Sequence, residues 1–168
     1  GGIVSYKKNS AEVSNRIDVY DYETKTWKTD SLSVARGGLA AASCGSIVIF
    51  AGGHDSNYNA LNIVDIYDLE SNTWSTDTLS QARGELTAAT LGNKIFFAGG
   101  YYDYANNKMS DRVDIYDVKT KKWSTSNLSR ARSELSSAST ADKLIIAGGG
   151  SYSTTKEFNT VDIYSGNK

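Results

Sequence analysis

Apolar residues along this chain occur in short runs that recur with a period near fifty residues. Unbroken apolar runs at 47–51, 95–98 and 144–147 are too short for helices and suit strands that are buried on both faces. Segments that alternate between polar and apolar residues, such as 64–67 and 113–116, predict strands whose two faces meet different surroundings. Because no convincing apolar stripe with helical spacing appears, the pattern predicts an all-β chain.

Two further segments complete each repeat. Small residues fill 39–43, 86–90 and 135–139, as strands require where several of them crowd towards one axis. Polar segments at 68–73 and 117–122 begin with an aspartate, which is a signal for a hairpin turn. Each repeat is therefore predicted to hold four strands: a (small residues), b (apolar), c (Asp-Ile-Tyr or Asp-Val-Tyr) and d (starting at a tryptophan).

The spacing between the repeated residues is constant except in one segment. The tyrosine of strand c precedes the tryptophan by seven residues, the tryptophan precedes an arginine by nine, and that arginine precedes a glycine pair by sixteen. Only the step from the glycine pair to the tyrosine varies, between 15 and 19 residues. Segments that tolerate such variation are surface loops, and in stacked repeats they gather on one face, which is often the binding face.

Four antiparallel strands repeated radially form the blades of a β-propeller. An apolar strand that ends in a glycine pair, followed by a spaced tyrosine and tryptophan, resembles the kelch family over essentially the whole chain. The chain departs from that family in having no proline near the end of strand d. The resemblance implies an all-β, kelch-type β-propeller in a single segment. We expect repeat units at about 1–37 (partial), 38–84, 85–133 and 134–168 (partial).

The number of predicted strands does not fill a closed ring. Strands c and d of a first blade, two complete blades and strands a, b and c of a last blade make 2 + 4 + 4 + 3 = 13 strands, about three and a quarter blades. Propellers typically have about four to eight blades, and an open stack would leave sheet edges exposed. We therefore expect part of a six- or seven-bladed ring, with the missing blades supplied by the same parent chain or by a second copy.

Composition and charge narrow the range of partners. The 168 residues include 39% hydrophobic and 22% charged residues, as in an ordinary globular protein, and the formal net charge is only −1. This charge provides no basic surface for nucleic acid or membrane lipid, and no apolar run is long enough to span a bilayer. We therefore expect neither nucleic acid nor a membrane as partner.

The residues that could perform chemistry do not form a catalytic or metal-binding pattern. His54 is the only histidine and Cys44 the only cysteine, whereas zinc and copper sites usually need several such ligands. Four aspartates recur once per repeat, which separates them around a ring, so we expect hydrogen bonds or ion pairs with the repeated arginines: Asp18, Asp65, Asp114 and Asp162. The repeated tryptophans and tyrosines are expected to pack blade against blade. We expect no metal, no cofactor and no enzymatic activity.

Three arginines, Arg36, Arg83 and Arg132, lie in the turn from strand d to the next strand a, beside the variable loops. Two interpretations stay open for them. They cap backbone carbonyls within the turn, or they converge on an anionic group, because a planar guanidinium suits bidentate recognition of a carboxylate. The kelch resemblance adds that arginines at this turn position line the peptide pocket in some members of the family.

The variable loops at 3–16, 54–63, 101–112 and 150–160 are rich in aromatic residues flanked by Asn, Ser and Asp. This composition is typical of protein-recognition surfaces, and the alternative is that the aromatic rings only cover the bases of the loops. The candidate partner-binding residues are Arg36, Arg83, Arg132, His54, Tyr58, Tyr101, Tyr102, Tyr104 and Tyr152.

We expect a non-enzymatic interaction module that binds a protein or peptide over the face formed by the variable b–c loops and the d–a turns. The alternative is a carbohydrate-binding or carbohydrate-active propeller, of the sugar-oxidase or sialic-acid-processing type, whose site is completed by missing blades. Tyrosines stack on sugar rings, so a glycan is the second candidate ligand. A copper-radical site needs two histidines, tyrosines and a cross-linked cysteine, which this segment alone does not contain.

Overall fold

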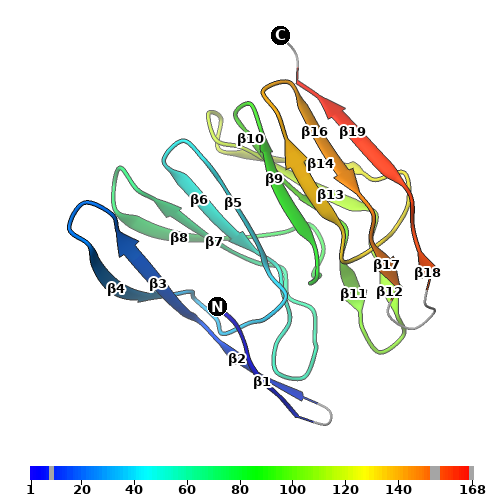
Figure 1. Ribbon diagram of the computed structural model, residues 1–168. Coiled ribbons are helices and arrows are strands. Elements are labelled where there is room, and N and C mark those ends of the chain that lie inside the picture. Colours follow the sequence, from blue (N-terminus) through cyan, green and yellow to red (C-terminus); the bar gives the residue numbers. More distant parts are fainter. Residues whose placement is uncertain (8–9, 152–155, 167–168) are drawn as a thin grey trace.

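The computed structural model describes residues 1–7, 10–151 and 156–166. Within these ranges the chain forms 19 strands and no helix, and thus no helix that could cross a membrane. The sheets stand side by side like the blades of an open fan (Figure 1). The prediction of an all-β propeller architecture is confirmed.

Two complete four-stranded blades lie in the middle of the chain. Each is a meander in which neighbouring strands pair antiparallel in the order a, b, c, d. The first complete blade consists of β5 (Ala40–Cys44), β6 (Ile47–Ala51), β7 (Ile63–Asp68) and β8 (Thr73–Thr78). The second consists of β9 (Thr87–Leu91), β10 (Lys94–Ala98), β13 (Arg112–Asp117) and β14 (Lys122–Asn127).

The two ends of the chain form partial blades. The first repeat contributes strands c and d, which are β3 (Arg16–Asp21) and β4 (Thr26–Ser31). The last contributes strands a, b and c, which are β15 (Ser136–Ser139), β16 (Lys143–Ala147) and β19 (Val161–Ser165). The strand pattern expected from the repeats is therefore present, with 13 blade strands among the 19.

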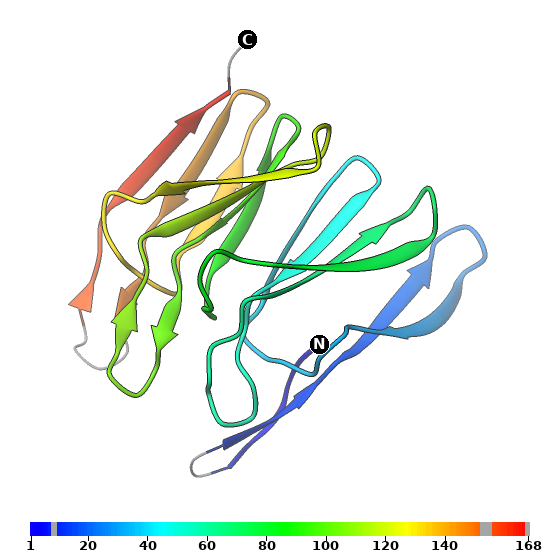
Figure 2. The same cartoon turned by 180° about the vertical axis from the view of Figure 1, so that it is seen from behind.

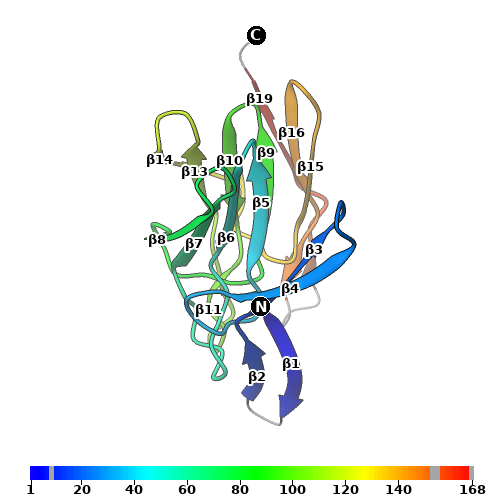
Figure 3. The same cartoon turned by 90° about the vertical axis from the view of Figure 1, so that its left-hand side faces the viewer.

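The other six strands form three short hairpins inside the variable loops. They are β1 (Gly2–Lys7) with β2 (Ser10–Ser14), β11 (Tyr101–Asp103) with β12 (Lys108–Met109), and β17 (Gly150–Ser151) with β18 (Lys156–Glu157). The sequence pattern predicts these segments only as loops. The hairpins project from the same edge of the molecule as the loop at 54–63, which the views from behind and from the side also show (Figures 2 and 3). We call this edge the loop face.

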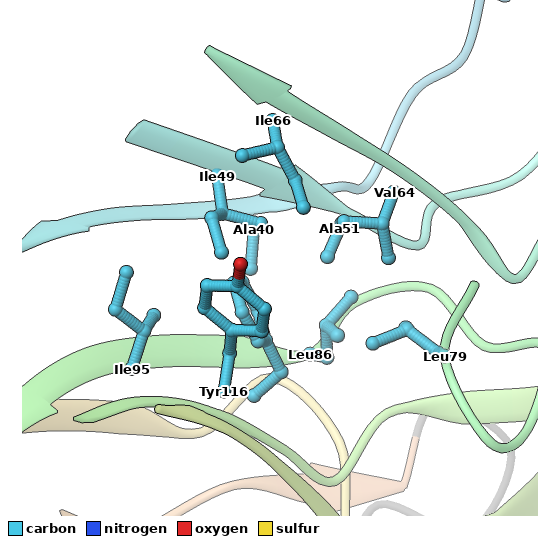
Figure 4. Close-up of a cluster of buried hydrophobic side chains, with 10 residues drawn as sticks. Ala40, Ile49, Ala51, Val64, Ile66, Leu79, Leu86, Ile95 and Tyr116 are labelled. Atoms are coloured by element: carbon cyan, nitrogen blue, oxygen red, sulfur yellow. The ribbon is translucent and has the colours of Figure 1, made fainter. Parts of the chain in front are cut away.

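Apolar side chains from two neighbouring blades form the core between them (Figure 4). Ile49 and Val64 of the first complete blade are fully buried, and they belong to the same cluster as Ile95 of the next blade. Burying one such side chain stabilises the fold by about 1.5–3 kcal/mol. A second cluster joins the second complete blade to the last one through Val113, Leu144 and other apolar residues.

The small-residue strands lie next to one another, as the sequence predicted. Strand β9 contacts both β5 and β15, so the three strands a are neighbours on the inner side of the blades. Short hydroxyl side chains link them, with Thr87 Oγ1 2.8 Å from Ser137 Oγ and Thr90 Oγ1 donating to the Ser43 carbonyl at 2.7 Å. Small side chains allow this close approach.

The repeated tryptophans connect the outer strands of successive blades. The indole N–H of Trp74 donates to Asp30 Oδ2, and that of Trp123 donates to Asp77 Oδ2, both at 2.8 Å. Each bond runs from strand d of one blade to strand d of the blade before it. For these two tryptophans the packing of blade against blade is confirmed.

The outer faces of the partial blades expose apolar side chains. Trp27 in β4 is 68% exposed, and Val161 and Ile163 in β19 are also exposed. In the interior blades the corresponding faces are covered by a neighbouring sheet. The expectation that further blades cover these faces, from a parent chain or a second copy, stays a prediction.

Candidate functional site

The three repeated arginines lie inside the fold. Arg36, Arg83 and Arg132 are all fully buried. Each guanidinium forms an ion pair with the aspartate of the following strand c, with N···O distances of 2.7 Å to Asp65, 2.7 Å to Asp114 and 2.8 Å to Asp162. The expectation that the repeated aspartates pair with the repeated arginines is confirmed at these three positions.

The same arginines also bind backbone carbonyls. Their Nη2 atoms donate to carbonyls of strand b at 3.0–3.2 Å, and their Nη1 atoms donate to the carbonyl two residues earlier in the turn. The capping interpretation therefore describes their role. This corrects the expectation that they reach an anionic group of a partner, because a fully buried, ion-paired guanidinium is not accessible on the loop face. We leave Arg36, Arg83 and Arg132 out of the candidate surface.

The paired aspartates also hold the d–a turns in place. Oδ1 of Asp162 accepts the backbone N–H of Ser129 at 2.9 Å, and Asp65 and Asp114 accept equivalent bonds from the preceding turns at 3.0 and 3.1 Å. Burial raises the pKa of the Asp162 carboxyl, but the Ser129 N–H and Arg132 outweigh this effect, so the pKa lies below its ordinary value. Removing one partner of such a buried pair typically costs about 3–5 kcal/mol.

His54 is also buried, at the base of the 54–63 loop. Its ring stacks on Tyr58 with centroids 4.8 Å apart and meets the Tyr104 ring edge-on at 5.4 Å. Nδ1 lies 2.8 Å from the Asp55 carbonyl oxygen, whereas Nε2 has no hydrogen-bond partner among the described residues and faces Glu85 Oε1 at 3.8 Å. This corrects its assignment as a partner-binding residue, because the His54 ring is fully buried and packs against the two tyrosine rings.

The candidate tyrosines separate into buried and accessible positions. Tyr101 is only 2% exposed and packs against Tyr104, with ring centroids 5.3 Å apart. Its ring therefore covers the base of the loop, which corrects the prediction that Tyr101 contacts a partner. Tyr58 and Tyr104 are half-buried, and Tyr102 is 39% exposed. Tyr152 lies outside the described residues.

A groove of about 800 Å³ lies between the loops of the two complete blades. We call it the tyrosine groove. The rings of Tyr58 and Tyr104 are 6.1 Å apart and tilted at 52°. The lining residues come from two segments: Asn57, Tyr58, Asn59 and Ala60, and Tyr102, Asp103, Tyr104 and Ala105.

Each wall of the groove is held by an aspartate that binds its own loop. Asp55 accepts the backbone N–H groups of Asn57 and Asn59 at 2.8 and 2.9 Å and the Asn59 side-chain amide at 2.8 Å. On the other wall Asp103 accepts the backbone N–H of Asn106 at 3.1 Å and its amide at 2.8 Å. The Asn106 bonds lower the pKa of Asp103, so this carboxylate is ionised at neutral pH.

Two glutamates, Glu85 and Glu134, stand in successive d–a turns beside Gly38 of the preceding turn. All three residues have positive φ, of 52°, 52° and 61°. The Glu85 N–H donates to the Gly38 carbonyl at 2.8 Å, and the Glu134 N–H donates to the Glu85 carbonyl at 3.1 Å. We call these three residues the inner rim. Burial raises the pKa of Glu85, His54 opposes this effect and Glu134 adds to it.

Sequence reasoning missed Asp103, Asn57, Asn59 and Glu85. The signal for the loop walls was present, because an aspartate followed by asparagines three or four residues later is typical of a turn closed by its own side chains. Glu85 carried no such signal, since nothing in the sequence shows that it has a left-handed backbone beside His54. In the described parts of the chain, no group of three or more His, Cys, Asp or Glu residues is placed to hold a metal ion.

Comparisons with known proteins agree with this geometry. The chain is similar to a solved structure described as "Structure of YjhT", with a TM-score of 0.68 and 18% sequence identity. The likeness covers 91% of this chain but 52% of that one, so the chain spans about half its length. At this identity the likeness shows the fold alone. No curated protein matches the chain.

A family model matches almost the whole sequence. It is described as the KLHDC2/KLHL20/DRC7 Kelch-repeats domain, and it matches residues 1–167. The match covers both the repeated frame of glycine pairs, aspartates, tryptophans and arginines and the variable loops between them. With four-stranded blades in that same register, the chain belongs to the kelch-repeat family.

Proposed function

We propose that this chain is a non-enzymatic interaction module that binds a protein or peptide segment in the tyrosine groove. The observation that carries the proposal is the groove itself, which opens on the loop face between two blades. Kelch domains generally bind protein partners. A volume of about 800 Å³ is within the range of ordinary ligand pockets.

The walls of the groove suit recognition because they are held in place before a ligand arrives. The Asp55 and Asp103 hydrogen bonds fix the two loops, and His54 supports the rings of Tyr58 and Tyr104 from beneath. A site that is already ordered loses less conformational entropy on binding. Tyrosine and asparagine also provide large contact area together with adaptable hydrogen bonding.

The three repeated arginines and His54 are engaged in the interior of the fold. The arginines are ion-paired with aspartates in the interior, and His54 is buried under tyrosine rings. This arrangement supports a role in binding.

The test is selection of peptides from a displayed random library on the full chain, followed by substitution. Tyr102→Ala should lower the affinity for the selected peptides about 10-fold or more, because truncating a tyrosine that anchors an interface costs about 2 kcal/mol or more. The matched control is Tyr22→Ala, because Tyr22 is 78% exposed in the β3–β4 turn at the edge opposite the loop face. The control should bind like the unmodified chain, and both variants should keep its melting temperature.

Two outcomes would contradict the proposal. Either no peptide is selected, or the selected peptides bind Tyr102→Ala as tightly as the unmodified chain. A glycan array probed with the same three proteins tests the carbohydrate alternative. Glycan binding that is lost in Tyr102→Ala, without any peptide binding, would favour that alternative.

A further inference from the structure

We infer that the outer edge of β19 is a docking site for an extended partner segment that carries a tryptophan and adds to the last blade as its strand d. The segment that fits has the residue pattern of β8 and β14, with its tryptophan opposite Tyr164. This site is separate from the tyrosine groove, so the inference does not depend on the proposed function.

Strand β19 has a free edge. In the described parts of the chain its sheet runs in the order β15, β16, β19, so β19 pairs with β16 on one side only (Figure 1). The equivalent strands of the complete blades, β7 and β13, pair on their second side with β8 and β14. The second side of β19 therefore offers backbone N–H and C=O groups to which an extended segment can pair by strand addition.

Nothing in the sequence of β19 protects this edge. Natural edge strands commonly carry lysine, proline or a bulge that blocks further pairing. The strand Val161–Ser165 contains neither residue, and its register with β16 runs through five consecutive positions without a bulge. Val161 and Ile163 are also 53% and 62% exposed. A strand of this kind is open to a further strand.

The other blades determine which residue would lie opposite Tyr164. In three blades a tyrosine of strand c pairs with a tryptophan of strand d, and their ring centroids are 4.8–4.9 Å apart: Tyr20 with Trp27, Tyr67 with Trp74, and Tyr116 with Trp123. Tyr164 has the equivalent place in β19, paired with Leu144 of strand b, and is half-buried. Because aromatic pairs add to the stabilisation that burial alone provides, a tryptophan is the residue that fits opposite Tyr164.

A hydrogen-bond acceptor lies at the same register. The indole N–H groups of Trp74 and Trp123 donate to Asp30 and Asp77, and each of these aspartates lies three residues after the tryptophan of the preceding strand d. The next residue in this series is Ser126 of β14. A tryptophan opposite Tyr164 would therefore direct its indole N–H to the Ser126 hydroxyl.

The surroundings of Ser126 support this placement. Burial and the nearby Asp77 carboxylate raise the pKa of Tyr116, so Asp77 lies close to the tyrosine of the following blade. Burial also raises the pKa of Tyr164, and a hydrogen bond with the Ser126 side chain opposes that effect. Ser126 thus lies beside Tyr164 as Asp77 lies beside Tyr116. Since a hydroxyl is a weaker acceptor than a carboxylate, docking at β19 should be weaker than the two interior junctions.

The experiment uses a peptide with the sequence of residues 71–80, which contains strand β8, and two variants of it. One variant carries Trp74→Ala, and the other has 1-methyltryptophan at that position, which keeps the ring but lacks the N–H. Each peptide is titrated into the isotope-labelled full chain and followed by NMR. We expect the tryptophan peptide to shift the amide resonances of Val161–Ser165. The alanine peptide should bind about 10-fold more weakly or worse, and the methylated peptide a few-fold more weakly.

A substitution in the chain tests the hydrogen bond from the other side. Ser126→Asp introduces the acceptor of the interior junctions, so it should raise affinity for the tryptophan peptide about 5- to 10-fold and leave the methylated peptide unchanged. Ser75→Asp is the matched control, because it adds the same charge at an exposed position of β8 and away from β19. It should bind like the unmodified chain. If Ser126→Asp does not fold, the three peptides on the unmodified chain still decide the question.

Four results would overturn the inference. The first is the absence of shifts at Val161–Ser165 up to millimolar peptide. The second is that the shifts fall on Tyr58 and Tyr104, which would make the peptide a ligand of the tyrosine groove. The third is equal affinity for the tryptophan and alanine peptides. The fourth is that β19 resonances shift with protein concentration alone and stop doing so in Trp27→Ala, which would assign the edge to a second copy of this chain.

Discussion

The first repeat and the first complete blade carry the same residues at the same spacing but use them differently. Asp65 is buried and pairs with Arg36, which comes from the turn before its blade. Asp18, at the matching position, is exposed and pairs with Arg16 two residues before it in its own strand. The same residue is thus an interior ion-pair partner in one blade and a surface group in the other.

The tryptophans differ in the same way. Both Trp27 and Trp74 pack against the tyrosine of their own blade, with ring centroids 4.9 and 4.8 Å apart. Trp74 also donates its indole N–H to Asp30 of the preceding blade, whereas Trp27 is mostly exposed. For Asp65 and for Trp74 alike, the partner residue comes from the preceding repeat. The difference teaches that a repeat of this chain is completed by its neighbour, so the stabilising unit is the junction between two blades.

The largest difference between the two regions is expected when the arginine is removed from one interior ion pair and from one surface ion pair. Arg83→Met should destabilise the chain by about 3–5 kcal/mol, because it leaves Asp114 buried without its cation. Arg16→Met should change stability by less than about 0.5 kcal/mol, since both partners of that pair are largely exposed. Urea unfolding of the two variants measures the difference. Equal losses would show that the interior pairs are no more important than surface pairs.

A smaller effect is expected from the tryptophans. Trp123→Phe keeps an aromatic ring but removes the hydrogen bond to Asp77, so it should cost about 1–2 kcal/mol. Trp27→Phe should cost only a few tenths of a kcal/mol, because that side chain has water on most of its surface. Thermal unfolding of both variants provides the measurement. A Trp27→Phe loss as large as that of Trp123→Phe would contradict the junction model.

The smallest expected effect is the pH dependence of the stability that Asp162 provides. The exposure of its side chain lies between that of the interior aspartates and that of Asp18. Because the folded-state pKa of Asp162 is lowered, its ionised form stabilises the fold above the ordinary aspartate pKa of 3.8. That contribution should be lost as the pH falls through the lowered folded value. The difference in the free energy of unfolding between Asp162→Asn and the unmodified chain should therefore shrink as the pH falls below about 4.

Stability curves between neutral and strongly acidic pH test this prediction. Asp18→Asn in the first repeat is the matched control. Its free energy of unfolding should stay close to that of the unmodified chain at neutral pH, because Asp18 is exposed. A gap between Asp162→Asn and the unmodified chain that stays constant over the whole range would show that the Asp162 carboxyl does not stabilise the fold by being ionised.

The strands of the blades were predictable because their apolar side chains are buried at regular intervals. Runs such as 47–51 and 144–147 show this burial directly, and the structure has β6 and β16 there. The hairpins β11–β12 and β17–β18 were not predicted, because their short pairing depends on how a variable loop folds back on itself.

The candidate site was only partly predictable. The aromatic loops identified Tyr58, Tyr102 and Tyr104, which line the groove. The same reasoning also chose Tyr101 and His54, which are buried beneath it. Residues of the same type at neighbouring positions differ in exposure because the loop turns between them, and composition carries no information about that turn.

By itself the sequence determined the repeat, the four-stranded blade and the family frame. A period near fifty residues, with fixed steps between tyrosine, tryptophan and arginine, permits few other arrangements. Tertiary structure alone decided which charges are buried and where the loop face is hollow. The burial of an apolar side chain can be predicted from its hydrophobicity, but a charged side chain is buried only when its partner lies within reach. Arg83 and Asp114 are brought together only because a d–a turn folds against the next blade.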